Sequence, residues 1–262
     1  MPSVLTGANL ANRELIYLGV SGDGDSASIG LGQFAHALRR GVNMVYIVEN
    51  NGVYGLTKGQ FSATADRGSK SKRGVTNSDN SIDLVAMALQ LGATFVARSF
   101  SGDKTQMVPL IKAAIEHEGA AFIDIVSPCV AFNNHAGSTK SFDYVREHNE
   151  AVNRLDFITG RAPITVAYEP GSMEVVEQHD GSKLVLKKVA ADYDAHDRLG
   201  AMSFLQRHAA LGQVVTGLLY VDREPEDLHR HFNTVEAPLN SLSDQELCPG
   251  SATLDKINAG LR

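Results

Sequence analysis

Short apolar runs alternate with longer amphipathic segments through the first half of the chain. The runs have the length of β-strands and lie at residues 15–20, 44–48, 94–97 and 121–126. Apolar side chains with the three- or four-residue spacing of helices recur between them, over 29–38, 82–89 and 107–115. Almost continuously apolar strands that alternate with helices indicate an α/β fold, with a parallel sheet covered by helices on both faces.

The pattern changes after residue 160, where shorter extended segments replace the regular alternation. Extended segments are expected at 163–168, 173–176 and 183–189, with Asp180-Gly181 as a hairpin turn. A helix over 195–211 and a strand over 218–221 follow. We therefore expect two parts, a ligand-binding domain at residues 1–160 and a smaller C-terminal extension at 161–262.

Composition and charge exclude several protein classes. Of the 262 residues, 43% are hydrophobic and 21% are charged, as in ordinary globular domains. An apolar run of roughly 18 residues is absent, so we expect no membrane span. The N-terminus lacks the basic and apolar segments of a secretory signal. The formal net charge of −6 disfavours nucleic acid as a partner. Together these features predict a cytoplasmic protein.

A glycine-rich segment stands between the first predicted strand and the first predicted helix. It reads Gly22-Asp23-Gly24-Asp25-Ser26-Ala27 and lies at the carboxyl edge of the predicted sheet, where α/β folds bind ligands. The free N–H groups at the start of a helix favour a phosphate there. The spacing G-x-G-x-x-A, with Glu49 at the end of the next strand, also fits a dinucleotide site. The motif by itself leaves both kinds of phosphate ligand open.

Two carboxylates favour a metal-bound diphosphate over a dinucleotide. Asp23 and Asp25 would face a pyrophosphate at short range, which is costly unless a cation lies between them. Mg²⁺ binds carboxylates and phosphates together. Because the carboxyl ends of adjacent parallel strands meet, Asn50-Asn51 after the second strand can supply another oxygen ligand. Two tight turns that bind no ligand are the alternative.

The two motifs together resemble the signature of thiamine diphosphate enzymes. Gly22-Asp23-Gly24 is followed, after 25 residues, by Asn50-Asn51. The resemblance implies that Mg²⁺ is bound by the Asp23 carboxylate, the Asn51 side chain and the backbone carbonyl of Val53. It also implies that the cofactor contacts further residues of both motifs, namely Gly22, Gly24, Asp25, Ser26, Tyr54, Gly55 and Leu56.

Other segments narrow the resemblance to the β subunits of 2-oxoacid:ferredoxin oxidoreductases, closest to the 2-oxoglutarate type. They are residues 54–60, Ser127-Pro128-Cys129, Asn133-Asn134-His135 and Gly137-Ser138-Thr139-Lys140. Enzymes of this family oxidatively decarboxylate a 2-oxo acid to its acyl-coenzyme A and pass electrons through an iron–sulfur cluster to ferredoxin. The resemblance is strong over about residues 5–160 and moderate beyond them.

The resemblance also implies a partner. It makes residues 1–160 the diphosphate-binding half of a thiamine site and gives residues 161–262 contacts with other subunits and the electron acceptor. The glutamate that activates the cofactor is expected on a separate α subunit. An αβ heterodimer, or a dimer of such heterodimers, is therefore expected.

The printed sequence contains only part of the iron–sulfur ligand set that the resemblance implies. The family pattern makes Cys129 one of four ligands of a [4Fe–4S] cluster, and a small buried thiol is the alternative. The chain has two cysteines, of which Cys248 is interpreted as incidental. The other three ligands are expected in an N-terminal segment that precedes residue 1 of the printed sequence.

Lys58 is a candidate substrate residue. It follows the second motif, where its ammonium group either pairs with the distal carboxylate of a dicarboxylic 2-oxo acid or is simply solvated. Two other functions stay open. One is a non-catalytic subunit that binds the α partner without transferring electrons, and the other is a different thiamine diphosphate-dependent decarboxylase or synthase.

Overall fold

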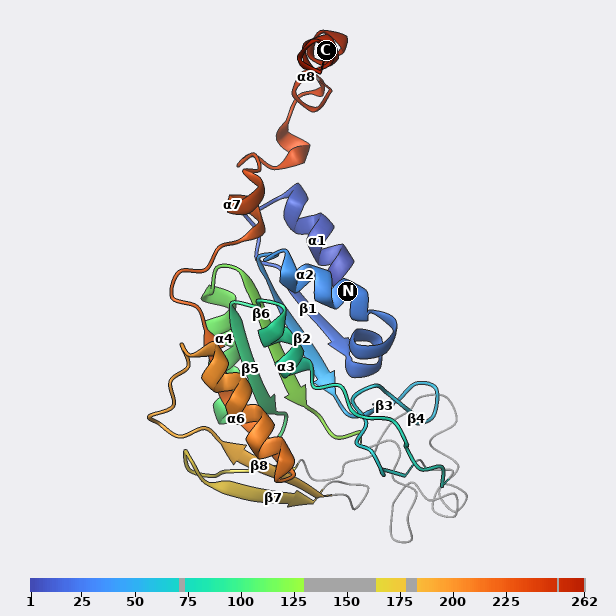
Figure 1. Cartoon of the computed structure of the whole chain (residues 1–262), viewed down its shortest axis with the longest axis vertical. Coiled ribbons are helices and arrows are strands. Elements are labelled where there is room, and N and C mark those ends of the chain that lie inside the picture. Colours follow the sequence, from blue (N-terminus) through green and yellow to red (C-terminus); the bar gives the residue numbers. More distant parts are fainter. Residues whose placement is uncertain (71–73, 130–163, 178–182, 249, 262) are drawn as a thin grey trace, which may run out of the picture.

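The computed structural model describes residues 1–70, 74–129, 164–177, 183–248 and 250–261 (Figure 1). A seven-stranded sheet with the order β1-β2-β6-β5-β9-β8-β7 forms its centre. The strands are β1 (Leu18–Gly22), β2 (Met44–Asn50), β5 (Phe95–Phe100), β6 (Ala120–Val126), β7 (Met173–Glu177), β8 (Lys183–Lys188) and β9 (Gln213–Val221).

The first four strands in this order, β1, β2, β6 and β5, form the parallel half of the sheet, as the apolar runs predict. β1, β2, β6 and β5 pair in parallel, with Met44 opposite Ala120 and Phe95 opposite Ala121. β1 begins three residues later than expected, because its pairing with β2 starts at Leu18 opposite Val45. Leu15 and Ile16, which the apolar run includes, are exposed side chains outside the strand.

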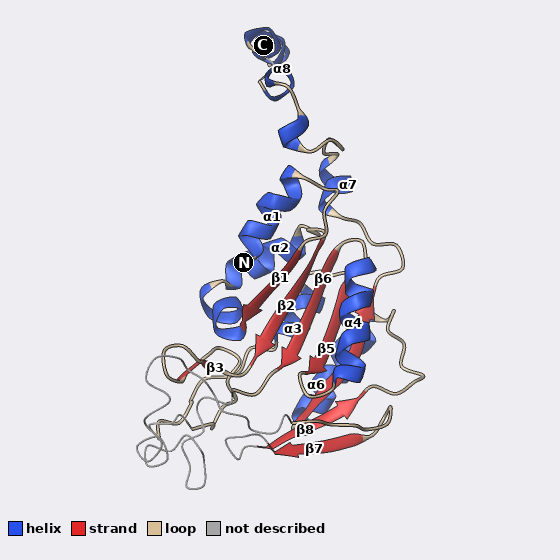
Figure 2. Ribbon diagram, turned by 180° about the vertical axis from the view of Figure 1, so that it is seen from behind, coloured by secondary structure: helices blue, strands red, loops and turns tan. Residues whose placement is uncertain are grey.

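Helices cover both faces of this sheet. The helices α1 (Pro2–Ala11), α2 (Leu31–Arg39), α3 (Leu84–Gln90) and α6 (Arg198–Ala210) pack on one face, and α4 (Lys104–Glu116) packs on the other (Figures 1 and 2). Three buried rings, Phe34, Tyr46 and Phe122, meet beneath α2, with Phe34 edge-on to Phe122 at 5.0 Å between centroids. The prediction of an α/β fold with helices on both faces is confirmed.

The C-terminal part completes the same sheet. β9 pairs antiparallel with β5 and parallel with β8, and β7 pairs antiparallel with β8. The sheet is therefore mixed, and only its β1–β5 half is wholly parallel. Residues 164–168 form no strand, although an extended segment was expected there. The proposed domain boundary at residue 160 and the Asp180-Gly181 turn lie outside the described residues.

The last described segment leaves the body of the molecule as an arm. Before the arm, α7 (Leu228–Phe232) still packs on the core through the buried Leu228. The arm contains a short 3₁₀ turn (Leu239–Ser241), α8 (Asp244–Leu247) and α9 (Ser251–Gly260). α9 contains no buried residue and stands away from the sheet in both views (Figures 1 and 2). Within the described ranges, no helix is long and apolar enough to cross a membrane.

Candidate functional site

The glycine-rich segment and the asparagine pair lie side by side at the carboxyl edge of the sheet. Gly22 ends β1 opposite Glu49 of β2, and β2 continues to Asn50. After β1 the chain enters a π-helical turn (Asp25–Ile29) that leads into α2. After β2 it forms a small hairpin of β3 (Val53–Tyr54) and β4 (Gln60–Phe61). This arrangement brings the two predicted motifs together.

Asp23 is the buried centre of this edge. Asp23 is only 1% exposed, and its Oδ2 atom accepts a hydrogen bond of 2.9 Å from the N–H of Gly52. The hydroxyls of Ser62 and Thr64 donate to the same oxygen. A buried carboxylate needs such donors, because burial without them costs several kcal/mol. The hydrogen bonds recorded for Asp23 among the described residues all end at Oδ2, so Oδ1 is left for another ligand.

Ser62 and Thr64 were not among the residues predicted from the sequence. They follow β4, and the N–H of Thr64 donates to the Ser62 hydroxyl oxygen at 3.3 Å. Two hydroxyl residues spaced by one position after the second motif are a weak sequence signal. They contact Asp23 because the chain after the β3–β4 hairpin passes over the Asp23 side chain.

Asn51 and Asp23 bind neighbouring N–H groups of one turn. The Oδ1 atom of Asn51 accepts from the N–H of Val53 at 3.0 Å, and Asp23 accepts from the N–H of Gly52. Gly52 adopts φ 74°, a conformation that glycine takes without strain. A carboxylate, an amide oxygen and the Val53 carbonyl at one turn form an oxygen set of the kind that Mg²⁺ binds.

Clusters of acidic or sulfur ligands do not form a metal centre in the part of the chain that the structure describes. Among the described residues, no group of three or more His, Cys, Asp or Glu side chains is arranged to hold a metal ion. The oxygen set at the turn contains one such residue, Asp23, and its other two members are neutral oxygens.

The two glycines of the first motif have different surroundings. Tyr54 donates its hydroxyl to the carbonyl of Gly24 at 2.9 Å, and a Cβ atom on Gly24 would lie 2.5 Å from the Tyr54 ring. The second motif therefore packs directly on the first. By contrast, a Cβ atom on Gly22 would meet no atom within 4 Å. The open space beside Gly22 leaves room for a ligand to approach the backbone.

Asp25 and Ser26 are held by their own neighbours. Ser21 donates its hydroxyl to the exposed Asp25 side chain. The buried Ser26 hydroxyl donates to the carbonyl of Gly22 at 2.8 Å and lies 2.8 Å from the Tyr46 hydroxyl. The Ser26 side chain thus faces the core, so only the Ser26 backbone is available to a ligand at this edge.

The hairpin loop carries the remaining candidates. Leu56 is 95% exposed, and Ile29 at the end of the π-helical turn is 79% exposed. Lys58 is also exposed and adopts φ 75°, which is uncommon for a residue with a side chain. The loop is closed by the N–H of Gly59, which donates to the carbonyl of Tyr54 at 2.9 Å. Leu56 and Lys58 thus lie exposed on the hairpin loop, and Gly55 is half-buried.

Cys129 comes three residues after the end of β6, the strand that pairs with β2 at this edge. It follows β6 through Ser127 and Pro128, and the N–H of Ser127 donates to the carbonyl of Asn50 at 2.8 Å. Cys129 is a partly exposed free thiol, and Cys248 is an exposed thiol on the arm. The segments Asn133-Asn134-His135 and Gly137-Ser138-Thr139-Lys140 lie outside the described residues.

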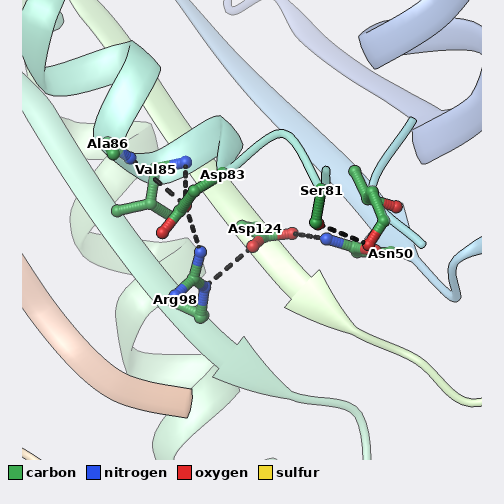
Figure 3. A network of polar contacts seen from close by, with 8 residues as sticks. Asn50, Ser81, Asp83, Val85, Ala86, Arg98 and Asp124 are labelled. Atoms are coloured by element: carbon green, nitrogen blue, oxygen red, sulfur yellow. Dashed lines mark hydrogen bonds and ion pairs between the residues drawn. The ribbon is translucent and has the colours of Figure 1, made fainter. Parts of the chain in front are cut away.

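A buried ionic network supports the end of β2 (Figure 3). Arg98 binds Asp83 at 2.5 Å and Asp124 at 2.8 Å, and Asn50 donates to Asp124 at 3.1 Å. Burial by itself would lower the pKa of Arg98, but the fields of Asp83 and Asp124 outweigh it and raise that pKa further. The guanidinium is therefore charged at every relevant pH. Sequence reasoning missed this network, because Arg98 follows a run interpreted as an apolar strand.

Comparison with known proteins identifies relatives over about half of the chain. Residues 1–125 match the family described as thiamine pyrophosphate enzyme, C-terminal TPP binding domain. The chain is 45% identical over 130 residues to the 2-oxoacid:ferredoxin oxidoreductase subunit beta of Sulfolobus sp, covering 49% of this chain and 43% of that protein. It is 40% identical over 147 residues to the 2-oxoglutarate oxidoreductase subunit KorB of Mycobacterium tuberculosis, covering 56% and 38%. The matched segments span less than half the length of these two relatives.

A solved structure resembles nearly the whole chain. It is a 2-oxoglutarate:ferredoxin oxidoreductase from Magnetococcus marinus with 2-oxoglutarate, coenzyme A and succinyl-CoA bound. The TM-score is 0.66 at 28% sequence identity, and the match covers 94% of this chain and 70% of that chain. The likeness therefore extends past the first half into the C-terminal strands.

Proposed function

We propose that this chain acts as a β subunit of a 2-oxoacid:ferredoxin oxidoreductase, because residues 1–125 match a thiamine pyrophosphate-binding domain and its relatives carry that name. Together with an α partner, it would oxidatively decarboxylate a 2-oxo acid to its acyl-coenzyme A and pass the electrons to ferredoxin. Its own part is to bind Mg²⁺ and the diphosphate of thiamine diphosphate. The protein would work in the cytoplasm.

The arrangement around Asp23 is the observation that carries this proposal. Three donors on one carboxylate oxygen fix the side chain and leave the other oxygen for a cation. Asn51 and the Val53 carbonyl on the adjoining turn provide the two further oxygens. A cation held there would neutralise the repulsion between the Asp23 carboxylate and a diphosphate.

The glycine-rich segment is proposed to receive the diphosphate. The open space at Gly22 admits it, and the N–H groups at the start of the helical segment after Gly24 favour its negative charge. The hydrogen bond from the Tyr54 hydroxyl to the Gly24 carbonyl holds the β3–β4 hairpin against the glycine-rich segment. When bound, thiamine diphosphate supplies the electron sink that decarboxylation of a 2-oxo acid requires.

A 2-oxo acid with a second carboxylate is the proposed substrate. The names of two related proteins specify 2-oxoglutarate, and one of them binds 2-oxoglutarate together with coenzyme A. Lys58 on the exposed hairpin loop is the proposed partner for the distal carboxylate. Leu56 on that loop would lie against the bound substrate, the cofactor or the α subunit.

The iron–sulfur cluster does not fit this sequence alone. A [4Fe–4S] cluster takes four thiolates, and the sequence contains two cysteines, one of them on the distant arm. Cys129 is the proposed ligand, and we assign no step of the reaction to the cluster.

A second candidate function is a subunit that does not transfer electrons. A chain with two cysteines could bind the α subunit and the cofactor without passing electrons onward. Reconstitution of the αβ complex with iron and sulfide, followed by electron paramagnetic resonance after reduction, separates the two functions. A cluster signal that disappears in Cys129→Ala supports the catalytic subunit, whereas its absence from the reconstituted complex supports the second function.

Calorimetric titration of the αβ complex tests the central proposal. Thiamine diphosphate is expected to bind only with Mg²⁺, and Asp23→Asn is expected to abolish this binding. Asp255→Asn on the exposed α9 is the matched control and should bind as the wild type does. Wild-type complex that does not bind thiamine diphosphate in the presence of Mg²⁺ would refute the proposal.

A further inference from the structure

A row of polar side chains crosses three strands and ends at Asn50, the residue that precedes the proposed Mg²⁺ turn at residues 51–53 (Figure 3). In the sheet register, Arg98 of β5 lies opposite Asp124 of β6, and Asp124 lies opposite Val48 of β2. Asn50 is two residues beyond Val48, so its side chain projects from the same face and reaches Asp124 at 3.1 Å. The row therefore runs from β5 to the last residue of β2.

The row is anchored at its far end by a helix. Asp83 is the N-cap of α3, where its Oδ1 atom accepts the N–H groups of Val85 at 2.9 Å and Ala86 at 3.3 Å. The same oxygen binds Arg98 at 2.5 Å. Arg98 thus joins the start of α3 to the Asp124 carboxylate.

Asn50, the residue before the proposed Mg²⁺ turn, is held by two hydrogen bonds. Its side chain donates to Asp124, and its backbone carbonyl accepts from the N–H of Ser127. Both partners belong to β6 or to the segment directly after it. The next residue along the chain is the proposed ligand Asn51, and the one after it, Gly52, binds Asp23.

We propose that Asn50, held through Asp124 by Arg98, is a positioning residue that sets the geometry of the Mg²⁺ turn at residues 51–53. The inference rests on the proposed function and extends it to residues that do not touch the cation. Residues that hold metal ligands in place typically change metal affinity by about 10–100-fold when they are mutated. The charged row is also costly to bury, and an apolar row of similar volume is often no less stable. Arg98 at 8% exposure and Asp124 at 1% are therefore better explained by a positioning role than by stability.

The test removes the link without breaking the ion pairs. Asn50→Ala leaves Arg98 between Asp83 and Asp124, whereas substitution of Arg98 itself would strand buried carboxylates and endanger folding. The measurement is the apparent Kd of Mg²⁺ for the αβ complex at saturating thiamine diphosphate, by calorimetry, together with thermal denaturation. We expect Asn50→Ala to raise this Kd about tenfold.

Ser99→Ala is the matched control. Ser99 is the next residue of β5, is fully buried, and donates to Gln106 of α4 at 3.0 Å on the opposite face of the sheet. It should lose comparable stability and keep the wild-type Kd for Mg²⁺. An unchanged Kd in folded Asn50→Ala, or an equal change in Ser99→Ala, overturns the positioning role. Wild-type complex that does not bind Mg²⁺ overturns the proposed function and this inference with it.

Discussion

The hydroxyl of Thr64 donates a hydrogen bond to the Oδ2 atom of Asp23, although 41 positions separate the two residues in the sequence. Ser62 donates to the same oxygen. The two hydroxyls bring the end of the hairpin back over the first motif. They fix which oxygen of Asp23 faces the protein and which oxygen remains for a ligand.

Replacement of these hydroxyls is expected to weaken both the fold and the site. Ser62→Ala and Thr64→Val each leave the buried carboxylate one donor short, which costs about 1–3 kcal/mol of unfolding free energy. The freed Asp23 side chain should also bind Mg²⁺ more weakly. Urea denaturation and calorimetry measure the two effects.

The control for this pair is Thr105→Val. Thr105 donates its hydroxyl to Asp103 at 2.6 Å at the start of α4, so it makes the same kind of bond on another element. It should lose stability without losing Mg²⁺ affinity. Equal loss of affinity in the control would mean that the effect on Asp23 is not local.

The two motif glycines are expected to respond differently to alanine. In Gly24→Ala the new Cβ would lie 2.5 Å from the Tyr54 ring, so we expect a loss of about 1–3 kcal/mol from overpacking. In Gly22→Ala the Cβ meets nothing within 4 Å, so stability should change by less than about 0.5 kcal/mol. Thermal denaturation compares the two variants.

Gly22→Ala, the variant that should keep its stability, is the one expected to lose cofactor affinity. Gly22→Ala fills the open space proposed for the diphosphate, so a folded, stable variant should bind thiamine diphosphate more weakly. Wild-type affinity in Gly22→Ala would contradict the assignment of that space. A stable Gly24→Ala would contradict the close packing of Tyr54.

Local pattern predicts most of the parallel half of the sheet, because strand and helix periodicity are local properties. It ends the third strand at residue 97, since a charge follows, yet β5 continues to Phe100. The charge is tolerated because Asp83 and Asp124, distant in sequence, pair with Arg98. The place of β9 between β5 and β8 was equally beyond prediction, since strand order depends on tertiary packing.

The same distinction applies to the site. The motifs predict that Asp23 and Asn51 come together, because parallel strands align their carboxyl ends. The hydroxyls of Ser62 and Thr64 and the link from Asn50 to Asp124 depend on the path of the chain after each motif. No residue-type pattern near Asp23 indicates them.

Removal of the Arg98 charge is expected to be one of the most destabilising single substitutions. Arg98→Met leaves Asp124, at 1% exposure, without a countercharge, and breaking such a buried pair costs about 3–5 kcal/mol. The Asp83 side chain is 37% exposed, so water can solvate it in part. The double variant Arg98→Met/Asp124→Leu should recover most of the stability in urea denaturation. A double variant no more stable than Arg98→Met would contradict this origin of the loss.

Acidification should destabilise the fold through two histidines. Burial lowers the pKa of His117 below its usual 6.5, against the opposing charges of Asp222 and Glu118. Burial also lowers the pKa of His229, whose Nε2 atom is buried without a partner among the described residues. Both rings therefore bind a proton more readily in the unfolded chain. Their contribution to stability is complete above pH 6.5 and is lost as the pH falls below that value.

Unfolding free energy measured by urea denaturation between pH 7.5 and about pH 5 should therefore decrease with acidity. His117→Gln and His229→Gln should each flatten part of this slope, because neither glutamine takes up a proton. His231→Gln, at an exposed neighbouring position, is the control and should keep the wild-type slope. An unchanged slope in both core variants would show that acid sensitivity arises elsewhere, because linkage requires any group whose pKa differs between the two states to appear in the slope.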